Sequence, residues 1–93
     1  MGDTIPSLSR TVYITNQLGL HARAAAKIVK IAQKASAGVW IIINREKADA
    51  SSIIDILTLA AAKDSQITIT IDDPSDVDIL NAIEEMVKEG FGE

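Results

Sequence analysis

The stretch Gln66-Ile67-Thr68-Ile69-Thr70-Ile71 alternates apolar and polar residues without interruption. Because successive side chains of a β-strand point to opposite faces, the three isoleucines share one face and the two threonines share the other. This pattern is typical of a strand buried on one side only, as in an antiparallel sheet with one face open to solvent. The sequence therefore predicts a sheet whose isoleucine-bearing face is covered by other elements.

Three further segments are predicted to be strands of this sheet. The run Val39–Ile43 consists of β-forming residues, and Trp40 and Ile42 should point away from the core if their neighbours point into it. A hairpin turn is expected at residues 44–46, because Asn and charged residues follow the run there. The other strands are expected at Ser9–Thr15 and, as a short and weak one, at Lys47–Ala50.

Three segments show the apolar spacing of amphipathic helices. Ser52 is a suitable N-cap for the second of them, and Asp55 stands at the position that completes an approximate capping box. The last helix should open at residues 73–75, carry a buried stripe and end before Gly90. The helices are expected at His21–Ala35, Ile53–Ala61 and from Asp73 to about Lys88, the last with its stripe at Val77, Leu80, Ile83 and Val87.

The predicted elements follow the order strand, helix, strand, strand, helix, strand, helix. Short connections and half-buried strands favour an α+β domain of two layers. We expect an open-faced sandwich in which a four-stranded antiparallel sheet carries three helices on one face. Residues 9–93 should form this single domain, and residues 1–8 a flexible N-terminal extension.

Composition narrows the classes of function that the chain can serve. A net charge of −4 argues against nucleic acid as a main ligand, because phosphate backbones require a basic surface. The absence of cysteine excludes thiol chemistry and disulfides, and no spacing of acids suggests a metal site or a cofactor. No apolar run approaches the length of a membrane span, and no signal pattern opens the chain. A cytoplasmic protein without membrane insertion is expected.

The single histidine, His21, stands at the expected start of the first helix. Backbone N–H groups in a helix's first turn have no partner within it, and the helix dipole adds partial positive charge. Arg23 adds a guanidinium group, which suits phosphate oxygens. Between Arg23 and Lys34 the first helix carries only basic charges. A nucleophile, N–H donors and a cation therefore lie close together. Chemistry on a phosphate group requires this combination.

Three stretches of the chain, in register, resemble the HPr family of histidine-containing phosphocarriers of the phosphoenolpyruvate-dependent phosphotransferase system. Residues 16–23, Asn-Gln-Leu-Gly-Leu-His-Ala-Arg, resemble its active-site signature. Residues 50–54 resemble its regulatory-serine region, and residues 59–63 resemble the end of its second helix. The resemblance covers roughly residues 11–87, and the expected order of elements is also that of the family.

The resemblance implies a carrier that is itself no enzyme and acts as a monomer. His21 would accept a phosphoryl group on Nδ1 from phosphorylated enzyme I and pass it to an enzyme II A-type domain in sugar transport, with Arg23 helping to hold the group. Ser52 matches the serine that a dedicated serine kinase/phosphorylase modifies in some bacteria. The implied partner surface comprises Ala22, Arg23, Ala26, Lys27 and Lys30 of the first helix, and Ile53, Ile54 and Leu57 of the second.

One position departs from the family pattern, and three other functions stay open. Ala24 stands where the family usually has proline, so the first turn of the helix should be less rigid and gain an N–H group. A carrier of the nitrogen-related branch shares the fold and the histidine, and residues 14–19 resemble that branch. A regulatory binding module without phosphate chemistry usually loses the histidine. A small hydrolase needs a second catalytic group near His21, which the sequence does not identify.

Overall fold

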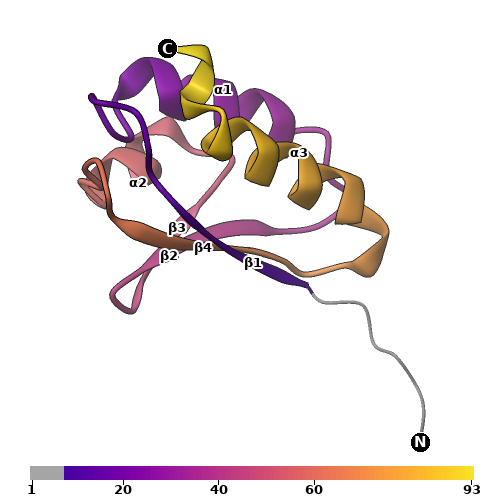
Figure 1. Ribbon diagram of the computed structural model, residues 1–93. Coiled ribbons are helices and arrows are strands. Elements are labelled where there is room, and N and C mark those ends of the chain that lie inside the picture. Colours follow the sequence, from indigo (N-terminus) through magenta and orange to yellow (C-terminus); the bar gives the residue numbers. More distant parts are fainter. Residues whose placement is uncertain (1–7) are drawn as a thin grey trace, which may run out of the picture.

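A four-stranded antiparallel sheet forms one layer of the protein in the computed structural model, which describes residues 8–93. The strands lie in the order β1-β4-β2-β3, so that β4 and β2 are central (Figure 1). Arg10 on β1 and Ile41 on β2 both pair with Ile69 of β4. The strands span Ser9–Tyr13 (β1), Val39–Ile43 (β2), Glu46–Asp49 (β3) and Gln66–Ile71 (β4).

Three helices form the second layer and lie on one side of the sheet, with α1 and α3 side by side (Figure 1). They span Ala22–Ala32 (α1), Ile53–Thr58 (α2) and Val77–Lys88 (α3). Single 3-10 turns precede and follow α3, at Pro74–Asp76 (η1) and Gly90–Gly92 (η2). The expected open-faced, two-layer α+β fold is confirmed, together with its order of elements.

The core lies between the sheet and the helices. Ile67, Ile69 and Ile71 are buried while Thr68 and Thr70 are half-buried, as the alternation predicts. Each fully buried isoleucine contributes about 1.5–3 kcal/mol relative to an exposed one. From the helices, the core receives Ile28 of α1, Ile56 of α2, and Leu80, Ile83 and Val87 of α3. Val77 is only half-buried, because it is the first residue of α3, directly after η1.

The open face of the sheet carries Trp40 and Ile42, both half-buried, as expected. The indole Nε1 of Trp40 donates a hydrogen bond to Asp72 (3.1 Å), and the Lys47 ammonium lies 4.3 Å from the ring centroid. A cation over an indole face is attracted by the quadrupole of the ring. The single tryptophan is thus held by polar neighbours on this face.

Several predicted boundaries are wrong by a few residues, for local reasons. The first helix ends at Ala32, since the N–H groups of Lys34 and Ala35 bond three residues back instead of four. The second ends at Thr58, and Ala60 adopts a positive φ of 50°. The hairpin turn is confined to Asn44 and Arg45, both with positive φ, so Glu46 already pairs with Ile43.

The last helix also starts later than predicted, because Asp73 and Asp76 hold a separate turn before it. The Asp73 carboxylate accepts a hydrogen bond from the Ser75 N–H (2.9 Å) and so caps η1. Asp76 is 4% exposed and accepts from the N–H groups of Ser36 (2.8 Å) and Ala37 (3.0 Å). A buried carboxylate needs such donors, and these two tie the end of the α1 region to the start of α3.

The expected flexible extension lies mostly outside the described residues, which exclude residues 1–7. Leu8, the last residue of that extension, packs against the core, and its carbonyl accepts a hydrogen bond from the Ile71 N–H (2.9 Å). Leu8 therefore belongs to the domain by its contacts. In the part of the chain that is described, every helix is too short or too polar to cross a membrane.

Candidate functional site

The loop that leads into α1 is fixed by contacts with the segment after α2. The Leu20 N–H donates to the Ala61 carbonyl (2.9 Å), and the His21 N–H donates to the Gly19 carbonyl (2.9 Å). Gly19 has a φ of +64°, and a Cβ there would lie 2.4 Å from the Ala61 oxygen. Only glycine fits this combination of conformation and close approach. The direction in which His21 leaves the loop is therefore set by tertiary structure.

His21 is the N-cap of α1, so the helix begins at Ala22, one residue later than predicted. Its backbone is extended (φ −79°, ψ 177°), and its carbonyl accepts the first helical hydrogen bond, from the Ala25 N–H (2.9 Å). Its side chain does not cap the helix, and the first turn contains no acidic residue. The N–H groups of the first turn have no carbonyl partner within the helix. They thus form a site suited to an anion beside the imidazole.

The imidazole of His21 contacts an acid from the far end of the chain. Its Nε2 atom lies within hydrogen-bonding contact of the Glu93 carboxylate, whose other oxygen accepts from the amide Nδ2 of Asn16 (3.1 Å). Nδ1 of His21 has no hydrogen-bond partner among residues 8–93. The hydrogen bond from Asn16 lowers the pKa of Glu93 below its usual range, and the nearby His21 and Arg23 act in the same direction.

The C-terminal segment, residues 90–93, folds back over α1 and carries this acid (Figure 1). Phe91 is 2% exposed, and its carbonyl accepts a hydrogen bond from the Lys27 ammonium (2.5 Å). The sequence suggested only a short tail here. Lys27 and Lys30, both predicted as part of a partner surface, are exposed, and the Lys27 ammonium is also bonded to this segment.

Arg23 lies in the first turn of α1, with an exposed side chain. Within the described residues, its guanidinium group forms no hydrogen bond or ion pair. It is close enough to Glu93 to lower the pKa of that carboxyl. An unengaged guanidinium beside the histidine is free to pair with an anion, which the role implied for Arg23 would require.

Ser52 is the N-cap of α2, as predicted. Its Oγ accepts a hydrogen bond from the Asp55 N–H (3.2 Å). The expected capping box is only half formed, because the Asp55 carboxylate accepts from the Asp49 N–H (3.4 Å) and not from Ser52. The Ser52 N–H donates to the Asp49 carbonyl (3.0 Å) instead.

Exposed apolar side chains gather on α2, which packs against α1. Ile54 is 75% exposed, and Ile53 and Leu57 are 39% and 38% exposed. Leu18, in the loop before α1, is 62% exposed; the sequence did not single it out. The alanines predicted for the partner surface, Ala22 and Ala26, are exposed on α1. The structure thus leaves all of the predicted partner residues exposed.

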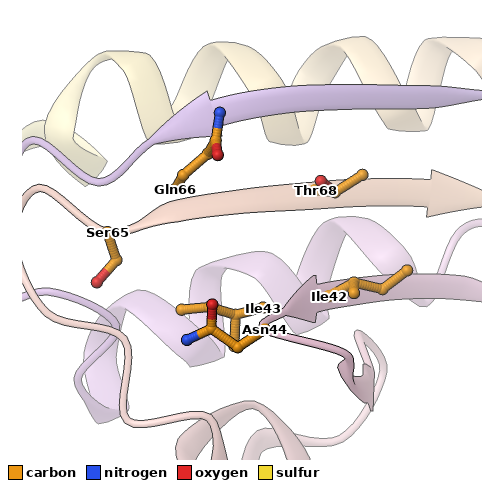
Figure 2. A pocket seen from close by; sticks show the side chains of 6 residues that line it. All are labelled: Ile42, Ile43, Asn44, Ser65, Gln66 and Thr68. Carbon is orange, nitrogen blue, oxygen red and sulfur yellow. The ribbon is translucent and has the colours of Figure 1, made fainter.

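Among the surface hollows formed by residues 8–93, two lie away from His21. One, of about 330 Å³, lies at the open face of the sheet where β2 ends and β4 begins (Figure 2). The other, of about 420 Å³, lies between α3 and the C-terminal segment and includes Lys27. His21 lines neither hollow. The residues of the first are Ile42, Ile43, Asn44, Ser65, Gln66 and Thr68.

A family model described as "PTS HPr component phosphorylation site" matches residues 8–89, nearly the whole chain. The chain belongs to the HPr family. It is a phosphocarrier of the phosphotransferase system, as its resemblance to the family implies. The HPr family model covers both His21 and Ser52, whereas Glu93 lies beyond the matched range.

Curated relatives carry the names of both branches of the HPr family. The "Phosphocarrier protein HPr" of Neisseria meningitidis is 33% identical over 86 residues, covering 92% of this chain and 97% of that protein. The "Phosphocarrier protein NPr" of Klebsiella oxytoca is 38% identical over 89 residues, covering 94% and 98%. The crystal structure of HPr-C-His from Thermoanaerobacter tengcongensis matches with a TM-score of 0.85 and 29% identity, covering 91% of this chain and 96% of that one.

Two residues at the histidine were not found from the sequence. Asn16 belongs to the stretch that resembles the active-site signature, but the sequence assigns no role to its side chain or to Glu93. Glu93 lies 72 residues from His21, and no local pattern connects them. Asn16 is 6% exposed, and its place in that stretch is the one signal that the sequence offers.

Proposed function

We propose that His21 accepts a phosphoryl group from phosphorylated enzyme I and passes it to enzyme II A-type domains, so that the chain is a carrier and not an enzyme. One observation supports this most strongly. The imidazole stands at the uncapped N-terminus of α1 with Nε2 engaged by Glu93 and Nδ1 unengaged. A phosphoryl group on Nδ1 would lie next to N–H donors and the unengaged Arg23.

For this reaction the carrier mainly has to position the phosphoryl group and stabilise its negative charge. Phosphoryl transfer depends mainly on in-line placement and on stabilisation of the oxygens of the transferred group. Neutral imidazole is a competent nucleophile near neutral pH. The exposed Ile53, Ile54 and Leu57 would pack against a partner and exclude water, while Arg23 and Lys30 would attract acidic partners.

The decisive experiment is incubation with enzyme I and phosphoenolpyruvate, followed by intact mass spectrometry. We expect the mass of one phosphoryl group to be added, and the adduct to be labile in acid. His21→Ala should abolish the adduct entirely, while Lys34→Ala, at the far end of the α1 region, should leave it unchanged. An unmodified wild-type protein, or an adduct that persists in His21→Ala, would overturn the proposal.

The nitrogen-related branch is a second candidate, because relatives named NPr have slightly higher sequence identity to this chain. The NPr proteins of Klebsiella oxytoca and Escherichia coli are 38% and 37% identical, compared with 33% for the HPr of Neisseria meningitidis and 36% for that of Cupriavidus necator. Differences this small do not choose between the branches. A comparison of phosphorylation rates would choose between them. The protein is incubated with enzyme I of the sugar branch and with enzyme I of the nitrogen branch, and the cognate enzyme should phosphorylate His21 faster.

A hydrolase is a further alternative, because Glu93 supplies the second group beside His21 that it requires. The proposed carrier should hold its phosphoryl group until a partner accepts it. We therefore expect the phosphorylated protein to release phosphate slowly at neutral pH. We also expect it to hydrolyse neither phenyl esters nor phenyl phosphates. Sustained turnover that His21→Ala abolishes would favour the hydrolase.

We further propose that Ser52 is a site of phosphorylation by a serine kinase/phosphorylase. Phosphate there would stand at the start of α2, where the dipole of the helix favours negative charge. It would also place negative charge next to Ile53 and Ile54, on the surface proposed for acidic partners. Kinase treatment should add one phosphoryl group that Ser52→Ala prevents. An unchanged rate of transfer from enzyme I after modification would contradict this regulation.

A further inference from the structure

We propose that Glu93 is a positioning residue that selects the reactive nitrogen of His21, an inference that rests on the proposed phosphoryl transfer. Its carboxylate would keep the imidazole proton on Nε2 and so leave the lone pair of Nδ1 free to attack. A carboxylate only accepts hydrogen bonds, so a neutral imidazole in contact with it through Nε2 must carry its proton there. Carboxylates orient histidines in this way at many functional sites.

Asn16 fixes the direction of that carboxylate. Its Nδ2 donates to the Gly19 carbonyl (2.9 Å) and to Oε1 of Glu93 (3.1 Å). Turning the amide over would set its own oxygen against two acceptor oxygens, so only one orientation makes both bonds. Asn16 is 6% exposed, and water cannot readily replace these partners. One oxygen of Glu93 is therefore occupied by Asn16, and the other faces His21.

The C-terminal segment brings Glu93 to this place. The buried Phe91 ring packs into the core, and the Lys27 ammonium binds the Phe91 carbonyl (2.5 Å). Gly90 turns the chain with a φ of +66° directly after α3. The acid therefore stands on a segment that core packing holds, as a positioning role requires.

In this arrangement each bond, electron pair and proton of the transfer step has a defined place. The lone pair of Nδ1 forms the new bond to phosphorus, while the bond from phosphorus to the donor atom breaks and its electron pair stays on the donor. The proton on Nε2 remains in place, so the ring gains positive charge as the new bond forms. The Glu93 carboxylate then faces a cationic ring and stabilises it. Reversal of the same step delivers the group to the acceptor.

The single histidine makes a direct test possible, because ¹⁵N-histidine labelling reports one imidazole only. In the wild-type protein, the neutral ring should show protonated Nε2 and unprotonated Nδ1 by NMR. In Glu93→Gln, the amide oxygen should keep the bond from Asn16, and the amide NH₂ should then donate to Nε2 of His21. The imidazole proton should move to Nδ1, and phosphorylation by enzyme I should slow by about tenfold or more.

Two variants separate positioning from general effects. Glu89→Gln removes an exposed acid near the same end of α3, and both the tautomer and the rate should stay as in the wild type. Glu93→Ala removes the acceptor without adding a donor, so a mixture of tautomers and an intermediate rate are expected. A Glu93→Gln protein with the wild-type tautomer overturns the inference, whatever its rate. Absence of phosphorylation in the wild type overturns the proposed function instead, which the NMR measurement distinguishes.

Discussion

The two helices beside the candidate site begin in opposite ways. At α2, Ser52 caps the helix with its own Oγ, and Asp55 adds an acid to the first turn. At α1, His21 occupies the N-cap but leaves its side chain outside the helix, and no acid stands in the first turn. A serine cap satisfies an N–H donor locally, whereas the donors of α1 stay available. The helix that should bind the phosphoryl group is thus the one that has no side-chain cap and no acid in its first turn.

The start of α1 depends on distant contacts where the start of α2 depends on its own residues. Leu20 bonds the Ala61 carbonyl, Asn16 bonds Glu93, and the Lys27 ammonium bonds the carbonyl of Phe91 in the C-terminal segment. Long-range contacts thus replace the missing cap. We infer that changes around α1 affect stability and transfer together, while changes at the cap of α2 affect stability alone unless they add charge.

The largest effect should come from Gly19→Ala. The new Cβ would lie 2.4 Å from the Ala61 carbonyl oxygen, and alanine is strained at a φ of +64°. We expect a loss of about 3 kcal/mol or more in the free energy of unfolding, measured by urea denaturation. His21 phosphorylation should fall as well, because the loop that directs the histidine must shift.

Gly90→Ala is the matched control for this change. It has a similar φ of +66°, but the nearest atom to its new Cβ is the Thr15 Oγ1 at 3.5 Å, an ordinary contact. It should cost only the backbone strain, about 1 kcal/mol. Equal losses for the two variants would show that the close approach at Ala61 does not hold the start of α1.

A smaller effect is expected at the start of α2. Ser52→Ala should lower stability by about 1 kcal/mol, since the cap to Asp55 is lost, and should leave the rate of His21 phosphorylation unchanged. Ser52→Asp keeps a capping side chain and so should keep stability, yet slow the transfer through its charge. Stopped-flow transfer and urea denaturation of both variants check this. A slow Ser52→Ala protein would contradict the separation of the two helix starts.

The sequence predicted what depends on neighbouring residues and missed what depends on the path of the chain. Alternation at Gln66–Ile71 predicted the half-buried β4, and Ser52 was identified as a cap because both signals are local. The position of His21 at a helix start followed equally from its neighbours. These parts of the fold and of the site were therefore predictable to within a few residues.

Glu93 and Asp76 were not predictable in the same way. No sequence pattern sets either acid apart, yet Asp76 is buried and Glu93 contacts His21. Their partners lie 40 and 72 residues away, and only the packing of α3 against α1 brings them together. Periodicity describes which face of an element is buried, and it does not describe which distant side chains meet at its ends.

The smallest effect is expected from restoring the proline of the family in Ala24→Pro. This position is in the first turn of α1, where an N–H has no helical partner, so proline removes no helical bond. Restriction of the unfolded chain should stabilise by about 0.4–1 kcal/mol, but proline disfavours the helical conformation of Arg23 before it. The net change should stay within about 0.5 kcal/mol.

Ala25→Pro, one residue later, removes the bond to the His21 carbonyl and should cost about 3 kcal/mol. If phosphorylation of Ala24→Pro changes by less than about twofold, the additional N–H group of Ala24 is not one of the donors that the phosphoryl group uses.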